Sequence, residues 1–203
     1  RITAITVQHQ GQTSQLGLDV LIDGSDRGDL FALADVPYRF GWEPQELWGE
    51  PSAPPLAQLE SNPFFQAQVV QSPTWVVMGQ LQSEMLTPAA APPPLAAPFE
   101  RASEAFGLER TINYGRLPGG LVMLNWPLHG NDWHQGLERA FSADPAEQAA
   151  LAAEMQSYSL QFARALEQAS GGWLQLGHAF PAEAGSPAPW LAAMPYWREG
   201  RRL

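Results

Sequence analysis

Short apolar runs separated by polar residues occupy the first third of the chain. Residues 2–7 combine isoleucine, alanine and valine with threonine, and residues 16–22 form a second, mostly apolar run after a glycine turn. This pattern predicts two strands that pair in a sheet. A short helix is expected over residues 29–34, ending before the next proline. Residues 44–63 are interrupted by prolines and acidic side chains, which predicts an excursion over the surface.

The middle of the chain contains two further apolar runs, over residues 75–78 and 121–124, which predict buried strands. Between them, residues 87–98 include three consecutive prolines and predict an extended, polyproline-like linker. A short helix is expected over residues 99–106. Strands and helices without regular alternation favour an α+β fold, with a mixed or antiparallel sheet, one long helix and several short ones.

The long helix is predicted to follow Asp144. Pro145 suits the first helical position, Glu147 is placed to complete a capping box with Asp144, and paired glycines end the pattern near residue 171. At ~1.5 Å per residue, such a helix would span about 40 Å. One apolar stripe runs along it, and we interpret this stripe as core: Leu151, Met155, Tyr158, Phe162 and Leu166.

Composition and charge narrow the possible functions. The 203 residues suffice for one substantial core. The net charge is −10 and every basic residue is arginine, so the basic footprint of a nucleic-acid-binding protein is absent and an anionic membrane would repel the chain. The lack of cysteine excludes disulfides and thiolate chemistry. Without a signal peptide or long apolar span, we expect a soluble protein with no membrane partner, and a cytoplasmic location is favoured.

The first candidate site lies where the apolar run after residue 16 ends in small and acidic residues. Gly24 and Ser25 would let a flat or phosphorylated ligand approach the backbone, because glycine has no Cβ to clash. The helix expected after Gly28 and Asp29 would offer free N–H groups in its first turn. This pattern is typical of half of a nucleotide site, yet the chain contains no G-x-G-x-x-G sequence.

The second candidate site is the polar, Trp- and His-containing segment 124–134. Convergent polar groups between aromatic walls are typical of a substrate pocket, with His129 or Asp132 as a proton-transfer group. Alternatively, the segment is a structural turn in which Asn131 and Asp132 bind local backbone and the Trp rings are core. His129, Asp132 and His134 do not have the spacing of a compact metal-binding motif, so no metal is expected.

The third candidate site is the segment 194–203, which carries three arginines. They could form a solvated tail, but Tyr196 and Trp197 are large anchors, and the planar guanidinium suits anions or flavin carbonyls. Other catalytic signatures are missing. The Asp23-Gly24 turn lacks the Thr or Ser that aspartic proteases place between Asp and Gly, and neither G-x-S-x-G nor a P-loop occurs.

Read in order, the three segments resemble the middle, substrate-side region of bacterial FAD-dependent oxidoreductases. Segments 22–30 and 34–41 resemble the family's Asp-Ala-Thr turn, Gly-Asp-Leu and Gly-Val-Pro-Tyr, and segment 123–132 resembles its central loop. Segment 195–202 resembles its Pro-Tyr-x-Arg-Glu-Ser-Arg-Arg sequence. Gly24-Ser25 replaces Ala-Thr, which keeps the turn small and retains a hydroxyl, whereas Gly200 replaces Ser and removes one.

The resemblance implies that FAD accepts a hydride from a small organic substrate. It implies three groups of site residues. Those expected next to FAD are Asp23, Gly24, Ser25, Gly28, Asp29 and Arg201. Those expected to be catalytic are His129, Asp132 and Arg198, and those expected to contact substrate are Asn125, Trp126, Asn131 and Tyr196.

The resemblance also implies a division of the chain. Residues 1–36 would belong to an incomplete FAD-binding domain, residues 37–193 to a substrate-side domain that includes the linker 87–98, and residues 194–203 to a segment returning to the FAD domain. The glycine fingerprint is expected before Arg1, so the chain alone would not hold FAD and its partners would include the remaining FAD-binding segments. The alternative is a non-enzymatic small-molecule or carbohydrate-binding module, which predicts Trp126 and Trp133 exposed on one face.

Overall fold

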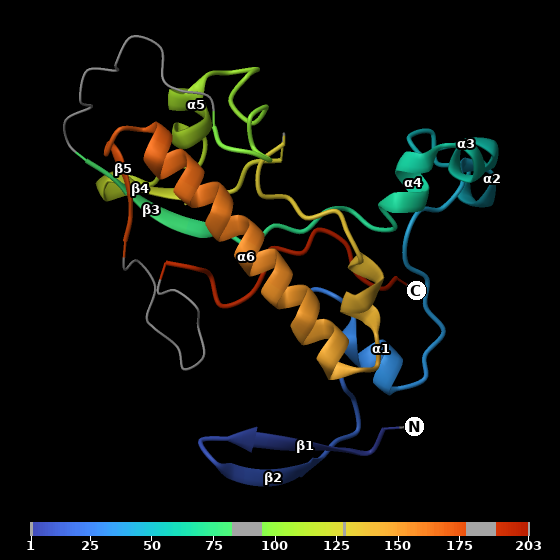
Figure 1. Ribbon diagram of the computed structural model, residues 1–203. Helices are drawn as coiled ribbons and strands as arrows, with labels where there is room; N and C mark the ends of the chain where they lie inside the picture. The colour runs from blue at the N-terminus through green and yellow to red at the C-terminus, as the bar shows by residue number, and fades with distance from the viewer. Residues whose placement is uncertain (1, 83–94, 128, 178–189, 203) are drawn as a thin grey trace.

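A computed structural model describes residues 2–82, 95–127, 129–177 and 190–202. The expected α+β fold is confirmed: one long helix lies along a small antiparallel sheet, and the other described helices are short (Figure 1). The sheet has the order β4-β3-β5, with β3 (Val77–Leu81) in the centre between β4 (Leu121–Leu124) and β5 (Leu174–Leu176). No helix in the described part of the chain is both long and apolar enough to cross a membrane.

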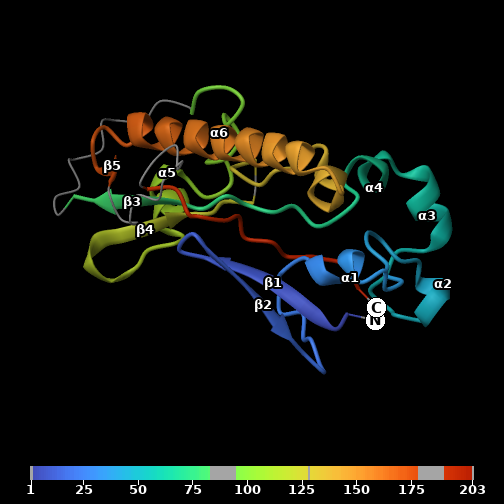
Figure 2. The same ribbon diagram turned by 90° about the horizontal axis from the view of Figure 1, so that it is seen from below.

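Helix α6 (Pro145–Ala169) lies along this sheet (Figure 2), and the residues of its apolar stripe pack in the core, as predicted. Phe162 and Leu166 are completely buried together with Val77, Val122 and Leu174 of the three strands. Their burial removes large apolar surfaces from water, which is the main source of stability for a fold of this size. Tyr158 is only partly buried, with its ring 5.0 Å from that of Phe99.

The helix begins at Asp144 as expected, but without the expected capping box. The Asp144 side chain accepts a hydrogen bond of 2.8 Å from the N–H of Ala146. The N–H of Asp144 itself donates to the hydroxyl of Ser142 over 3.1 Å, so this donor is satisfied by Ser142 and not by Glu147.

The two N-terminal strands form a hairpin, with β1 (Ala4–His9) antiparallel to β2 (Gln12–Gly17). Figure 1 shows this hairpin apart from the central sheet. The prediction of a strand over residues 16–22 was wrong after Gly17, because Gly17 pairs with Ala4 at the end of the ladder and no strand continues beside it. Val20 and Ile22 are 77% and 85% exposed.

Residues 44–63 lie on the surface as expected, but they contain regular structure that the sequence analysis missed. Helix α1 (Asp29–Leu33), which was expected, is followed by α2 (Gln45–Trp48), α3 (Leu56–Ser61) and α4 (Pro63–Ala67). Pro44 and Pro55 are the N-caps of α2 and α3, and Pro63 occupies the first turn of α4. At these positions proline lacks only an N–H that the helix does not use, so it begins a helix instead of breaking one.

Residues 95–113 also differ from expectation. Residues 99–106 form turns in place of the expected helix, and α5 (Leu108–Asn113) follows them. The carbonyl of Ala102 accepts the indole N–H of Trp126 over 2.8 Å, a tertiary contact that helps to hold the turns. Most of the expected linker 87–98 lies outside the described residues, and within its described part Leu95 is packed into the core.

The C-terminal segment returns along the central sheet toward the first third of the chain. Residues 190–196 pair with residues 74–78 through short backbone bridges, including Thr74 with Tyr196. Arg202 then pairs with Arg39, and the N–H of Arg201 donates to the carbonyl of Arg27 over 3.0 Å. The chain end is therefore fixed between the sheet and the loop before α1. Two single-turn helices, η1 (Pro118–Gly120) and η2 (Leu137–Phe141), complete the described elements.

Candidate functional site

A pocket of about 490 Å³ lies where three segments distant in sequence meet. Its size falls within the range of small-molecule sites in proteins. The loop before α1 forms one wall, the N-terminal half of α6 forms the second, and residues 193–195 with Trp75 and Trp197 form the third. The residues that line it include Gly24, Ser25, Arg27, Asp29, Trp75, Ala149, Met155, Met194, Pro195 and Trp197.

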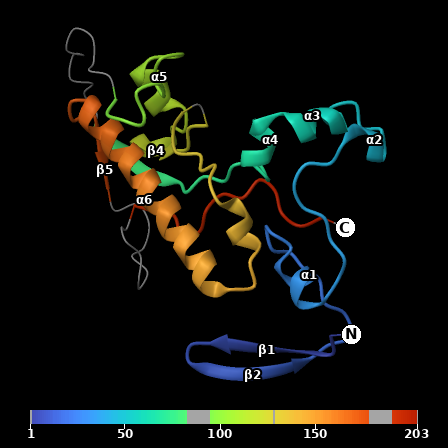
Figure 3. The ribbon, with the colours of Figure 1, turned by 45° about the vertical axis from the view of Figure 1, so that its right-hand side comes forward.

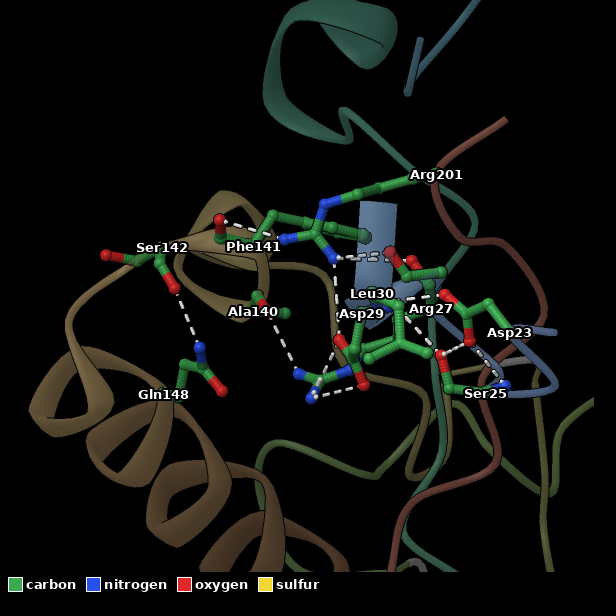
Figure 4. Close-up of polar contacts among 11 residues, drawn as sticks. Asp23, Ser25, Arg27, Asp29, Leu30, Ala140, Phe141, Ser142, Gln148 and Arg201 are labelled. Carbon is green, nitrogen blue, oxygen red and sulfur yellow. Dashed lines mark hydrogen bonds and ion pairs between the residues drawn. The ribbon is translucent and has the colours of Figure 1, made fainter. Parts of the chain in front are cut away.

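The loop wall is held by hydrogen bonds among its own side chains (Figure 4). One carboxylate oxygen of Asp23 accepts the N–H and the hydroxyl of Ser25, at 2.9 and 2.7 Å, and the other accepts the N–H of Leu30 at 2.9 Å. The Ser25 hydroxyl oxygen in turn accepts the N–H of Asp29 at 2.8 Å. These bonds, led by that from the Ser25 hydroxyl, hold the pKa of Asp23 below its ordinary value.

This bonding changes the role expected for the start of α1. The sequence predicts free N–H groups there that could bind a phosphate. In the structure, the N–H groups of Asp29 and Leu30 are already bound by Ser25 and Asp23. Asp23 therefore shapes the loop. Of the residues of this segment expected next to FAD, Gly24, Ser25 and Asp29 line the pocket, whereas Asp23 and Gly28 do not.

Arg27 is a pocket residue that the sequence analysis did not select. Its guanidinium donates to the carbonyl of Ala140 over 2.9 Å and lies 3.4 Å from the carboxylate of Asp29. It also lies over the ring of Trp197, 5.6 Å from the ring centre. Arg27 lies inside the candidate segment, between Ser25 and Gly28, so its position alone could have indicated a role in the site. Its residue type could not, because a surface arginine exposed to solvent looks the same in sequence.

Arg201 lies behind the loop, and it does not line the pocket. Its side chain is only 4% exposed and lies between the rings of Tyr38 and Phe141, 5.1 and 5.0 Å from their centres. The guanidinium donates to the carbonyl of Phe141 and to the carboxylate of Asp29, at 3.2 and 3.4 Å. It also lies 3.5 Å from the carbonyl of Gly28. Arg201 thus joins the C-terminal segment to the loop that forms the pocket wall.

Arg198, Asp132 and Asn125 come together as a second polar group. The Arg198 guanidinium lies 3.4 Å from the Asp132 carboxylate and donates to the side-chain oxygen of Asn125 over 3.3 Å. It also donates to the Thr74 hydroxyl at 3.1 Å and to the Ser72 carbonyl, and it lies over the ring of Tyr196. None of these residues lines the pocket. The group instead fixes residues 196–198 beside the strand that begins after Thr74.

The residues Asn131 and Trp126, expected to contact substrate, are buried in the core. Asn131 is 1% exposed; its side chain accepts the N–H of Trp126 at 2.9 Å and donates to the carbonyl of Leu124 at 3.0 Å. This geometry favours the structural-turn interpretation for these two residues. His129 is exposed, with a positive φ of 58°, and it does not line the pocket.

The alternatives to a flavin site gain no support from the described residues. The carbohydrate-binding module required Trp126 and Trp133 to be exposed, but Trp126 is 5% exposed and Trp133 is partly buried against Tyr158, with ring centres 5.3 Å apart. Among the described residues, no three His, Asp or Glu side chains are arranged to hold a metal ion.

Comparison with known families agrees with the resemblance of the three segments. The sequence model of the family described as FAD dependent oxidoreductase matches residues 1–203. No curated protein and no solved structure matches the chain. The family implies FAD as the cofactor and a small molecule as the substrate. The chain belongs to the FAD dependent oxidoreductase family.

Proposed function

We propose that this chain supplies the substrate pocket and one side of the flavin site for hydride transfer from a small organic substrate. The observation that carries the proposal is the pocket itself. It joins Gly24, Ser25 and Asp29 of the first family-like segment to Pro195 and Trp197 of the last, although about 170 residues separate them in sequence. The folding of two such segments around one cavity is the arrangement expected of a composite site.

The pocket fits the ring system of a flavin better than it fits the pyrophosphate. Its lining combines the polar side chains of Ser25 and Arg27 with the apolar and aromatic side chains of Trp75, Met155 and Trp197. A flat ring with polar edges needs such a combination. A Cβ added at Gly24 would meet no atom within 4 Å, so the space beside this backbone is open.

The pyrophosphate of FAD has no such counterpart among the described residues. The chain has no G-x-G-x-x-G sequence, and the N–H groups that begin α1 are bound by Asp23 and Ser25. We therefore assign to this chain the residues Gly24, Ser25 and Arg27 beside the flavin ring, and no phosphate contact. When bound, FAD supplies the acceptor for the hydride.

The residues of the chain have distinct roles in this proposal. Arg27 places a positive charge in the pocket wall, where it would stabilise negative charge on the reduced ring. Trp75 and Trp197 line the pocket with large apolar surfaces that would exclude water from it. Arg198 acts as a positioning residue, because its bonds to Thr74 and Asn125 fix the segment that carries Trp197. Asp132 supports Arg198, and the role of His129 stays a prediction from the resemblance.

Binding of riboflavin tests whether the pocket accepts the ring alone. The chain is expected not to retain FAD through gel filtration, since it does not hold the pyrophosphate. Riboflavin and FAD should still bind weakly and with similar affinity, measured by quenching of flavin fluorescence. Ala149→Trp, which fills the pocket from the exposed face of α6, should abolish this binding. The neighbouring exposed Ala150→Trp, whose site does not line the pocket, should leave binding unchanged.

The midpoint potential of the bound flavin in the complete product of the encoding gene tests the role of Arg27. Arg27→Met removes the positive charge and should make the potential more negative, because the reduced anionic flavin loses its stabilising partner. Arg110→Met, at an exposed arginine of α5, is the matched control. An unchanged potential in Arg27→Met, or equal effects of the two variants, would contradict the proposal.

A further inference from the structure

The helices α2, α3 and α4 belong to a surface segment, residues 42–68, which we name the arm. Figures 1 and 3 show the three helices lying apart from α6 and the central sheet. None of the residues in these three helices is buried. Helices as short as these are unstable in water unless packing or tertiary bonds support them.

Contacts within the arm supply that support. Trp42 packs edge-on against Phe65 with ring centres 4.9 Å apart, and its indole N–H donates to the carbonyl of Gln68 over 2.6 Å. Phe64 packs edge-on against Phe65 at 5.2 Å. The carboxylate of Glu46 accepts the N–H of Leu56 at 3.0 Å, which connects α2 to α3. The arm is therefore an ordered element with its own aromatic centre.

The arm nevertheless leaves large apolar side chains in water. Leu47 and Phe64 are each 51% exposed, Trp48 is 61% exposed and Leu56 is 46% exposed. Single exposed apolar residues are ordinary, but several on one small element that buries no helical residue are typical of a binding surface. Trp and Phe are also common among the residues that dominate protein interfaces.

The charge of the arm indicates which partner fits. It contains Glu43, Glu46, Glu50 and Glu60 and no lysine or arginine. Glu43 is already paired with Arg39 and Arg202, at 3.2 and 3.5 Å, so Glu46, Glu50 and Glu60 are the glutamates offered to a partner. A second copy of this chain, with a net charge of −10, would be repelled, and so would an anionic membrane. Trp48 already holds the guanidinium of Arg39 over its ring, 4.4 Å from the ring centre, so this indole accepts a cation.

We propose that the arm is a docking surface for a basic, amphipathic segment of a partner protein. Apolar side chains of the partner would cover Leu47, Trp48 and Phe64, and its arginines or lysines would face the glutamates. Apolar burial supplies most of the affinity in such an interface, whereas charge complementarity selects the partner and speeds association.

Binding of designed peptides to the full chain tests this proposal. The probe is a fluorescently labelled synthetic helix with leucine and tryptophan on one face and lysine on the other, and its counterpart carries glutamate in place of lysine. Fluorescence anisotropy should show saturable binding of the basic peptide, about tenfold or more tighter than the acidic one. Raising the salt concentration should weaken the binding of the basic peptide.

Variants locate the binding site. Leu47→Ala combined with Phe64→Ala should weaken binding of the basic peptide about tenfold or more, and Trp48→Lys should weaken it as well. Val20→Ala and Glu109→Lys, at exposed positions outside the arm, should leave it unchanged. Circular dichroism checks that each variant is folded.

Four results would overturn the proposal. The first is that the chain binds the basic and the acidic peptide with equal affinity. The second is that neither Leu47→Ala/Phe64→Ala nor Trp48→Lys changes the binding of the basic peptide. The third is a dimer in analytical ultracentrifugation that these variants dissociate, which would assign the arm to a second copy. The fourth is arm-dependent binding to phosphatidylserine vesicles, which would assign it to a membrane.

Discussion

Asp132 and Arg198 form an ion pair across 3.4 Å, with side chains that are only 10% and 16% exposed. The carboxylate also accepts a hydrogen bond from the hydroxyl of Thr74, and the guanidinium donates to the same hydroxyl oxygen at 3.1 Å. Two groups that the sequence suggested as catalytic thus satisfy one another beside the pocket. Their arrangement holds the C-terminal segment on the sheet. The third wall of the pocket depends on the position of this segment.

Replacing Asp132 with Ala should lower the free energy of unfolding by about 3 kcal/mol, because it leaves the Arg198 charge buried without its ionic partner. Urea denaturation followed by circular dichroism measures this change. Asp19→Ala, at an exposed carboxylate, should change stability by less than about 0.5 kcal/mol. Equal stabilities of the two variants would show that the ion pair contributes nothing to folding.

Replacing Asn131 should destabilise the protein about as much as replacing Asp132, although the hydrogen bonds of Asn131 involve no charged group. Asn131→Ala removes the acceptor for the N–H of Trp126 and the donor to the carbonyls of Trp75 and Leu124. Buried backbone groups without partners cost about 1–3 kcal/mol each, so a loss of about 3 kcal/mol is expected in the same denaturation experiment. Asn62→Ala, which removes an exposed helix cap, should cost only about 1 kcal/mol. A larger loss in Asn62→Ala than in Asn131→Ala would contradict this assignment.

Two substitutions at the start of α6 test whether the helix is capped by Asp144 alone or by a capping box that also uses Glu147. Asp144→Ala should destabilise the protein by about 1 kcal/mol, because the N–H of Ala146 loses its acceptor. Glu147→Ala should cost only a few tenths of a kcal/mol, from its interaction with the helix dipole. Thermal unfolding of both variants tests this, and a larger effect of Glu147→Ala would restore the capping box predicted from the sequence.

The parts of the fold that could be predicted from sequence were those in which local preferences and burial agree. The stripe from Leu151 to Leu166 repeats over several turns, and Asp144 and Pro145 mark its start, so α6 was found almost to the residue. The short helices of the arm were missed because proline at a helix start looks like a helix breaker in sequence. The strand expected over residues 16–22 ends at Gly17, because no neighbouring strand pairs with the residues that follow. An apolar run by itself does not show whether such a neighbour exists.

The candidate site divides in the same way. Gly24 and Ser25 could be selected because small residues after an apolar run mark a close approach of ligand and backbone. Arg27 could not, since its importance comes from Ala140 and Trp197, which are distant in sequence. Asn131 illustrates the opposite error, because a polar side chain in a loop resembles a ligand-binding group until its burial and backbone partners are known.

The carboxylate of Asp23 provides a pH-dependent test of the pocket wall. Bonds from Ser25 and Leu30 lower its pKa below the ordinary value of 3.8, so the folded state favours the ionised form. The resulting stabilisation is complete above pH 3.8 and is lost as the pH falls through the lowered pKa. The loop and α1 should therefore become less protected from hydrogen exchange in that acidic range.

Ser25→Ala should raise the pKa of Asp23 toward 3.8, because the hydroxyl of Ser25 is the largest cause of the shift. Carbon-13 NMR of the Asp23 carboxyl group measures this titration directly. The same substitution frees the N–H of Asp29, so hydrogen exchange at Asp29 should accelerate even at neutral pH. Ser14→Ala, on the exposed strand β2, should change neither quantity. If Ser25→Ala left the Asp23 titration and Asp29 exchange unchanged, the hydroxyl would not hold this wall, and Gly24 and Arg27 would owe their positions to other contacts.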